Sequence, residues 1–280
     1  MPVPLRLLRA GSPALVLLLL AGPPLLAQSG GAAAREPKVA WELGAARGGW
    51  CVHFLISPKA AGDLLLRGAR AVPAREDPGL PAAVRRVISD EPTYADWIPS
   101  QVCTWYTDGI SANHRGYERG DGGKQLALFW WGLTASGERT GNRPGLSLVV
   151  LGTNSSGLKR QMQLEFVEME RLEINRVPVK ESEDEEFSFK LDRTTVAFAG
   201  HPRPDSTLAV APVAYQSMVK GEDNRLWLVA FQARPTEIAG LSGSLRIQGK
   251  GELARALTES PIRLIGNIVT GGAGRVEFTE

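Results

Sequence analysis

The chain has 280 residues, of which 43% are hydrophobic, and a formal net charge of +2 at pH 7. This hydrophobic fraction fits an ordinary globular core. A nearly neutral chain with no block of lysine and arginine lacks the basic surface that nucleic-acid binding requires, so we expect no nucleic-acid partner.

Residues 1–27 have the pattern of a secretory signal peptide. Arg6 and Arg9 make the start positive, an apolar run follows, and Ala27 is a small residue at the expected cleavage position. The run is too short to span a bilayer, and no later segment has the roughly 20 apolar residues of a membrane helix. We therefore expect a secreted or periplasmic protein with no stable membrane insertion after cleavage; the alternative is a retained N-terminal anchor.

After the signal, the small and polar residues 28–38 predict a flexible linker. Residues 39–280 are then long enough for one large β-rich domain, which we expect them to form.

The first well-defined elements lie between Trp50 and Ile110. WCVHFLIS is short and rich in β-branched and aromatic residues, which predicts a strand. Ser57 is the expected N-cap of the next helix, Pro58 its first residue and Gly68 the left-handed residue that ends it. A second helix is expected from Leu80-Pro81 to Pro92, followed by a strand at 102–106.

Cys51 and Cys103, the only cysteines, each lie in one of these two strands. With an export signal present they are expected to form a disulfide, which would add about 4 kcal/mol of stability by the chain-entropy model. Because strand side chains alternate, His53 shares a face with Cys51, and Trp105 shares one with Cys103. The disulfide is expected to bring His53 near Trp105. The alternative is two free buried thiols.

The rest of the chain is read mostly as strands. In residues 126–131 both the odd- and the even-numbered positions are apolar. Since these positions face opposite sides of a strand, the pattern predicts a strand covered on both faces. A short helix is expected near 154–163, capped by Ser155 or Ser156. Residues 163–179 fit a strand, which we favour, or a helical stripe through Leu158 and Met162. Further strands are predicted at FSFKL, TTVAFAG, TLAVAP, VAYQSMV, LWLVAFQ, SLRIQG, IRLIGNIV and RVEFT, and a short helix at GELARALTES.

This pattern predicts a mainly β fold, that is, a β-rich α+β protein with a few short helices. Regular turn signals between the strands favour antiparallel pairing. We expect a closed barrel or cone, or a sandwich, since each of these leaves few exposed strand edges.

Motifs for common chemistries are missing from the sequence. With only His53, His114 and His201 available, no closely spaced pair predicts a metal site, and no cofactor motif is found. His201 is expected in a turn. The acidic run at 181–186 lacks calcium-loop spacing and is read as a solvated loop, and TGGAG is read as a glycine-rich turn.

Three residues are candidates for ligand binding. His53 lies in an apolar strand, where an imidazole would be desolvated, and Trp105 and Trp130 could line a ligand site. The alternative interpretation is structural: His53 would be a core histidine that bonds the backbone, and the tryptophans would be core residues.

HFLISPKAAGDLLLRGARAVPA resembles the entry segment of the acetoacetate decarboxylase-like fold, with Arg67 in place of the family's proline in the corner at 65–68. ESPIRLIGNIV followed by GRVEF is similar to its closing strands. The resemblance implies a cone-like β fold. The family's enzymes use a lysine activated by an adjacent lysine. No such pair occurs here; Lys124 is the nearest candidate in position, and it lacks a neighbouring lysine.

Three functions remain open at this point. The sequence favours an exported protein without catalytic residues that binds a small apolar ligand or an envelope partner. The first alternative is a Schiff-base lyase that uses Lys124 and His53. The second is a structural surface protein with a filled core.

Overall fold

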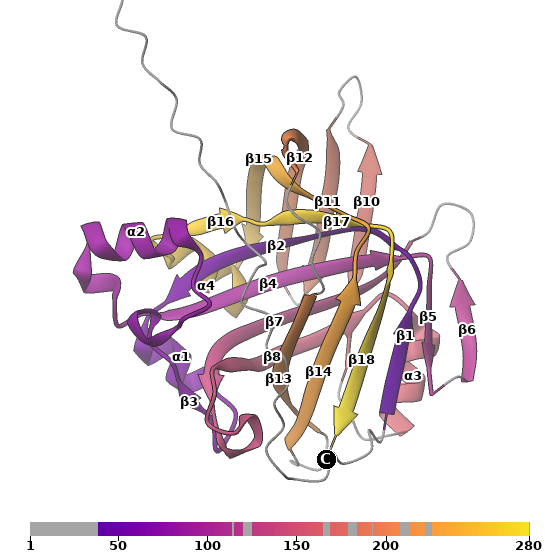
Figure 1. Ribbon diagram of the computed structural model, residues 1–280, viewed down its shortest axis with the longest axis horizontal. Helices are drawn as coiled ribbons and strands as arrows, with labels where there is room; N and C mark the ends of the chain where they lie inside the picture. Colours follow the sequence, from indigo (N-terminus) through magenta and orange to yellow (C-terminus); the bar gives the residue numbers. More distant parts are fainter. Residues whose placement is uncertain are drawn as a thin grey trace, which may run out of the picture.

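The computed structural model describes residues 39–113, 115–119, 125–164, 169–178, 184–191, 193–207, 213–221 and 226–279. Strands dominate these residues and form two sheets, with four short helices around them (Figure 1). The prediction of a mainly β fold with a few short helices is confirmed.

The larger sheet has 13 strands, in the order β16-β2-β4-β7-β8-β13-β14-β18-β1-β5-β6, with β3 beside β7 and β9 beside β8. Its pairs are antiparallel except β8 with β13 and β8 with β9, so the sheet is mixed. The strands are β1 (Val39–Leu43), β2 (Ala46–Ile56), β3 (Arg70–Ala71), β4 (Ile98–Thr107), β5 (Gly109–Ala112), β6 (Arg115–Arg119), β7 (Leu126–Ser136), β8 (Gly145–Thr153), β9 (Glu170–Arg171), β13 (Val213–Lys220), β14 (Leu226–Arg234), β16 (Arg263–Ile265) and β18 (Ala273–Thr279).

This sheet is strongly curved. Trp105 on β4 and Phe231 on β14 have ring centroids 5.6 Å apart, although β7, β8 and β13 lie between their strands. In a flat sheet four strand spacings would separate them by roughly 19 Å. The sheet therefore wraps around one apolar cluster that includes both rings, and we call the face that carries this cluster the inner face.

The C-terminal segment 263–279 holds the curved sheet together. Its first strand, β16, pairs with β2, and its last, β18, pairs with both β14 and β1. Between them Gly271 and Gly272 have φ of 63° and 65°, and a Cβ at either would overlap a neighbouring residue. The glycine-rich turn predicted here is thus the point where the segment changes partner strands. Two distant parts of the sheet share this segment, which gives a cone-like form.

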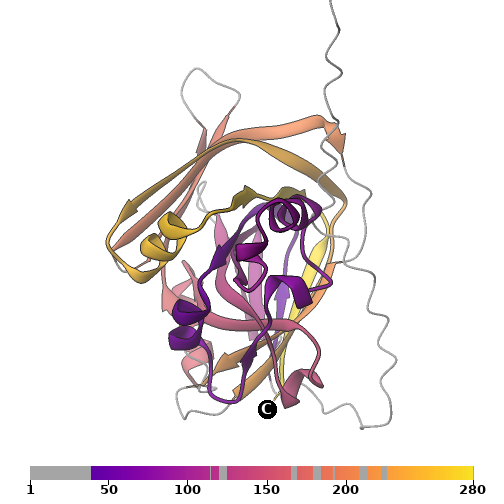
Figure 2. The same cartoon turned by 90° about the vertical axis from the view of Figure 1, so that its left-hand side faces the viewer.

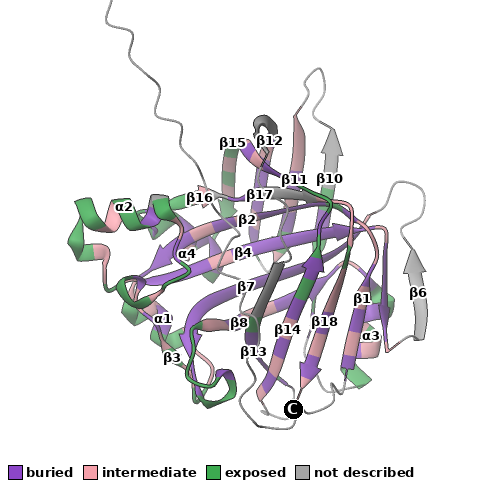
Figure 3. Ribbon diagram, in the orientation of Figure 1, coloured by how far each residue is buried: buried purple, intermediate pink, exposed green. Residues whose placement is uncertain are grey.

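The second sheet has five antiparallel strands, β10 (Glu173–Pro178), β11 (Glu185–Leu191), β12 (Thr194–Thr207), β15 (Glu237–Gly249) and β17 (Asn267–Thr270). It arches over one side of the large sheet (Figure 2). Phe189 and Phe198 on this sheet each lie 6.0 Å from the Trp50 ring of β2. The second sheet thereby covers the outer faces of β2, β4 and β7. All residues of β7 are buried (Figure 3), as predicted from the apolar residues on both of its faces.

The helices lie at the ends of the large sheet and beside the second one. They are α1 (Pro58–Leu64), α2 (Ala82–Asp90), α3 (Ser156–Leu164) and α4 (Glu252–Glu259), with 3-10 turns η1 (Ala74–Glu76), η2 (Pro92–Tyr94) and η3 (Glu138–Thr140). In Figure 1, α1 and α2 are at one end of the large sheet and α3 at the other. Among the described residues, no helix has the length and apolarity needed to cross a bilayer.

Helix caps follow the sequence closely. The Ser57 hydroxyl accepts a hydrogen bond from the Ala60 N–H, and the Ser155 hydroxyl accepts one from Leu158. Ser155 is therefore the cap of α3. The expected end of α1 was wrong: the helix stops at Leu64, and Gly68, whose φ is 85°, lies in the turn beyond it.

Other expectations were partly wrong. Residues 163 and 164 end α3, whereas 170–171 and 173–178 are strands, so the favoured strand begins later than predicted. His201 lies within β12 and not in a turn, because the strand continues to Thr207. The acidic run enters β11 at Glu185. Residues 181–183 and most of the strand predicted at TLAVAP lie outside the described residues.

Candidate functional site

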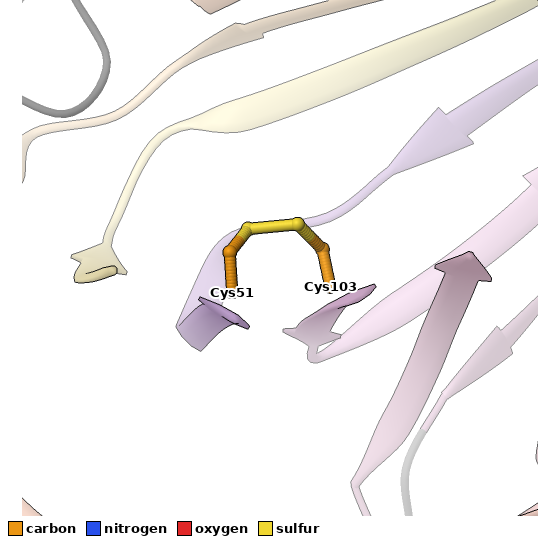
Figure 4. Close-up of a disulfide and its surroundings, with 2 residues drawn as sticks. All are labelled: Cys51 and Cys103. Atoms are coloured by element: carbon orange, nitrogen blue, oxygen red, sulfur yellow. A yellow bond between two sulfur atoms is a disulfide. The ribbon is translucent and has the colours of Figure 1, made fainter. Parts of the chain in front are cut away.

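The disulfide lies at the centre of the β2–β4 pair. Cys51 and Cys103 are direct cross-strand partners, with an S–S distance of 2.00 Å and Cα atoms 4.1 Å apart (Figure 4). Both sulfurs lie on the inner face, against its apolar cluster. The predicted bridge is confirmed.

The predicted proximity of His53 and Trp105 was wrong. β2 and β4 are antiparallel, so His53 is paired with Gln101, and Trp105 is paired with Gly49. The two side chains share a face but lie on opposite sides of the disulfide. Four residues of strand separate their rungs, which is about 13 Å.

His53 and Gln101 form a polar row on the inner face. Gly132 of β7 is the next residue along this row, opposite Gln101. On one side of the row lies the apolar cluster around the disulfide. On the other lies a smaller cluster, in which Leu55 and Leu264 pack against the α2 end. The row is therefore a polar break between two apolar regions of one face.

The row differs from the core around it in two ways. His53 and Gln101 keep some solvent-accessible surface, as does Cys51 beside them. Within the part of the chain that the structure describes, neither the imidazole nor the Gln101 amide makes a hydrogen bond. The backbone bond expected for a core histidine is therefore not found there.

The surroundings of His53 also alter its acid–base behaviour. Burial among apolar groups lowers the pKa of the imidazole to about 4 from an ordinary 6.5. Desolvation penalises the charged form of a histidine, and no nearby carboxylate compensates here. The ring is therefore neutral at pH 7, when it can donate and accept hydrogen bonds but carries no charge.

Trp105 and Trp130 lie beyond the disulfide on the same face. Their side chains are only 4% and 7% exposed, and both rings contact Phe231, at 5.6 and 5.8 Å. The Trp105 Nε1 and the Ser217 Oγ on β13 are buried, and neither has a hydrogen-bond partner among the described residues. Trp131, in contrast, faces outward, where its Nε1 donates to the Ser100 hydroxyl.

On β1, β2, β4, β7, β8, β14 and β18, the only ionisable side chain that lies on the inner face is His53. Glu42, Arg275 and Glu277 point the other way and form an ion-pair row across β1 and β18. On the edge strand β6, Arg115 and Glu118 are paired with Ala112 and Ile110 of the inner face. The described lysines lie on helices, on loops or on outward-facing positions: Lys59, Lys159, Lys190, Lys220 and Lys250. Lys124 and His114 lie outside the described residues.

Two other polar groups lie away from this face. His201 Nδ1 is 2.6 Å from the Asp184 carboxylate, and the pair is on the exposed side of the second sheet. Burial raises the pKa of Asp77, although the Gly79 N–H and the Thr134 hydroxyl oppose this by bonding its carboxylate. Asp77 joins the α2 loop to β7 and is structural. In the described part of the chain, no group of three or more potential metal ligands occurs.

Sequence reasoning found His53, Trp105 and Trp130 but missed Gln101 and Ser217. Gln101 could have been found, because it is the antiparallel partner of His53 once the disulfide fixes the register. Ser217 had no comparable signal. It joins this face only because β13 lies beside β8, which the sequence does not indicate.

Comparison with known proteins gives one kind of match. No family model and no curated protein matches the chain. Solved structures do match. The enduracididine biosynthesis enzyme MppR complexed with pyruvate is 13% identical, covers 89% of this chain and 91% of its own, and has a TM-score of 0.44.

Two further matches have related names. The acetoacetate decarboxylase from Legionella pneumophila is 7% identical over 86% of this chain and 87% of its own, with a TM-score of 0.45. An acetoacetate decarboxylase-like enzyme from Sphingomonas wittichii is 10% identical over 86% and 92%, with a TM-score of 0.44. The chain thus has a weak resemblance to the acetoacetate decarboxylase-like fold, as its entry segment indicated, and this likeness concerns the fold alone.

Proposed function

We propose that this chain is an exported protein that binds a small apolar molecule on the inner face of its large sheet and does not act on it chemically. The observation that carries the proposal is the indole N–H of Trp105. It is buried in an apolar cluster, and no described residue accepts a hydrogen bond from it. Leaving such a donor unpaired costs about 1–3 kcal/mol, which an acceptor atom on a bound molecule would recover.

The polar row supports the same reading. His53 and Gln101 interrupt an apolar face, and their side chains make no hydrogen bond to described residues. Binding sites for small molecules are mostly apolar, with a few placed polar groups that fix the orientation of the ligand. The aromatic cluster supplies the apolar part, and Trp105, His53 and Gln101 supply the polar groups.

Export is supported by two separate features. Residues 1–27 have the pattern of a cleaved signal. The Cys51–Cys103 bridge is of the kind that forms and persists outside the reducing cytosol. We propose that the mature chain works in the periplasm or outside the cell, where an envelope partner could deliver or receive the ligand.

The test is titration of the oxidised protein with N-phenyl-1-naphthylamine, an uncharged dye that fluoresces in apolar surroundings. We expect saturable binding of the dye and its displacement by 2-decanone, whose oxygen can accept a hydrogen bond. Trp105→Phe should weaken binding of the ketone about tenfold, because an aromatic ring stays and only the N–H donor is lost. Trp50→Phe is the matched control. Its Nε1 is also buried without a partner, but it lies between the two sheets. A folded protein that binds no dye would favour the structural protein with a filled core.

The lyase alternative has its own test. A Schiff-base enzyme would form an adduct between Lys124 and an added carbonyl compound, which borohydride would trap irreversibly. Mass spectrometry of wild type and Lys124→Met then decides. An adduct that is lost in the variant would overturn the proposal of a non-catalytic protein, and no adduct is the result we expect.

A further inference from the structure

We propose that the inner face selects an uncharged molecule with one hydrogen-bonding oxygen over ionised molecules of the same size. This inference rests on the proposed function and names the class of ligand. It follows from where the structure places charge and where it places polar groups without charge.

Charge is kept off this face along the strands around the polar row. β2, β4 and β7 carry no carboxylate there, and on β2 the only cation is Arg47, which is exposed at a bulge and pairs with Asp108. β1, β14 and β18 alternate apolar inward residues, such as Trp41, Val229 and Phe278, with outward ones that include all their carboxylates and guanidinium groups. Charged residues that are paired with inner-face positions occur on the edge strand β6. An ionised ligand at the polar row would therefore find no counter-charge on the inner faces of β2, β4 and β7.

The polar groups that are available suit a neutral oxygen. The Gln101 amide can donate and accept, and the neutral His53 ring can do either through its two nitrogens. The Trp105 N–H can only donate, and it lies on the other side of the disulfide. A carbonyl or hydroxyl oxygen would be satisfied by His53 and Gln101 at the row, or by Trp105 beyond the disulfide. A carboxylate or an ammonium would lose its hydration and gain only these neutral partners, which costs far more than burying a neutral group.

The row also gives the ligand a direction. Beside it, Cys103, Trp130 and Leu151 are cross-strand neighbours that form the next apolar row. A molecule whose oxygen meets His53 and Gln101 would lay its hydrocarbon part across this row toward Phe231. A molecule whose oxygen accepts from the Trp105 N–H would lie in the opposite direction, with its hydrocarbon part toward the polar row. An aliphatic alcohol or ketone has this arrangement of groups.

The experiment displaces N-phenyl-1-naphthylamine from the oxidised protein with four ligands of equal chain length at pH 8, each below its micelle concentration. They are 1-decanol, 2-decanone, decanoate and decyltrimethylammonium. We expect the alcohol and the ketone to bind at least tenfold more tightly than either ion, which corresponds to about 1.4 kcal/mol. Decanoate or the ammonium binding as tightly as decanol would overturn the inference.

Introducing one charge at the polar row tests whether this row is where neutral ligands are selected. Gln101→Glu places a carboxylate on the polar row with little change in shape, and it should bring decyltrimethylammonium to at least the affinity of decanol. Glu42→Gln is the matched control, because it exchanges the same two groups on the outward side of the same sheet. If the swap at Gln101 leaves the preference unchanged, or Glu42→Gln alters it equally, the inference fails.

The two proposals fail in different ways. If the folded protein does not bind the dye, the proposed function is wrong. If it binds the dye but treats neutral and ionised ligands alike, only the selection for uncharged ligands is wrong.

Discussion

His53 lies in a strand whose outer face is buried and whose inner face is partly accessible at Cys51 and His53, and its chemistry follows from that position. Sequence could place it in an apolar strand, and desolvation was the expected consequence. Sequence could not supply its neighbours, because these come from β4 and β16. Desolvation keeps the His53 ring neutral at pH 7, and its position beside Gln101 is consistent with the binding role that we propose.

The lowered pKa of His53 predicts a pH dependence of stability. In the unfolded chain the imidazole takes up a proton near pH 6.5, whereas in the folded chain it does so only near pH 4. The unfolded state therefore binds more protons between these values, and stability is lost as the pH falls through this window. Its contribution is up to about 3 kcal/mol.

Urea unfolding at pH 7, 5.5 and 4.5 measures this effect. His53→Gln keeps a neutral polar group and should flatten the pH dependence relative to wild type. His201→Gln is the control, since the His201 side chain is 48% exposed and lies on the second sheet. Equal slopes for wild type and His53→Gln would show that the imidazole is not desolvated.

At the scale of elements, the strands that could be predicted are those whose pattern is local. β2, α1, α2 and β7 follow from β-branched runs, caps and prolines within each segment, and the structure has them close to the expected positions. The order and direction of neighbouring strands depend on contacts between distant residues. The disulfide could be predicted, but for this reason the direction of β4 relative to β2 could not. As a result, His53 was expected on the same side of the disulfide as Trp105, whereas the two lie on opposite sides.

The β2–β4 pair also carries a prediction about the disulfide. Cys51 and Cys103 are 52 residues apart, and closing a loop of that length contributes about 4 kcal/mol in the chain-entropy model. Replacing both by alanine should therefore lower the unfolding temperature by about 8–16 °C for a chain of this size. Calorimetry of the variant, of oxidised wild type and of reduced wild type would show this. Equal melting of all three would mean that the bridge adds nothing to stability.

For the molecule as a whole, the decisive feature is segment 263–279. Its residues pair with β2 at one end and with β14 and β1 at the other, so it joins the first strands of the described chain to later ones. Sequence identified these residues as strands. The sequence could not show which strands β16 and β18 pair with, because strand pairing between distant residues leaves no local sequence pattern.

A substitution at Phe278 tests how much segment 263–279 contributes to the stability of the fold. It is fully buried, its ring centroid is 4.5 Å from that of Trp41, and it stands between β1 and β14. Phe278→Ala should cost about 3–5 kcal/mol, as buried phenylalanine truncations do. The neighbouring Thr279→Ala, which alters an outward position, should cost far less. Similar urea midpoints for the two variants would contradict this role.

The sharing of segment 263–279 also bears on how the protein is made. β1 and β2 leave the ribosome well before segment 263–279, so β1 has no β18 beside it, and β2 no β16, until that segment has been made. Pairings of such long sequence separation form slowly. The emerging chain must therefore wait with its apolar early strands uncovered, which gives chaperones a binding target until β16 and β18 arrive.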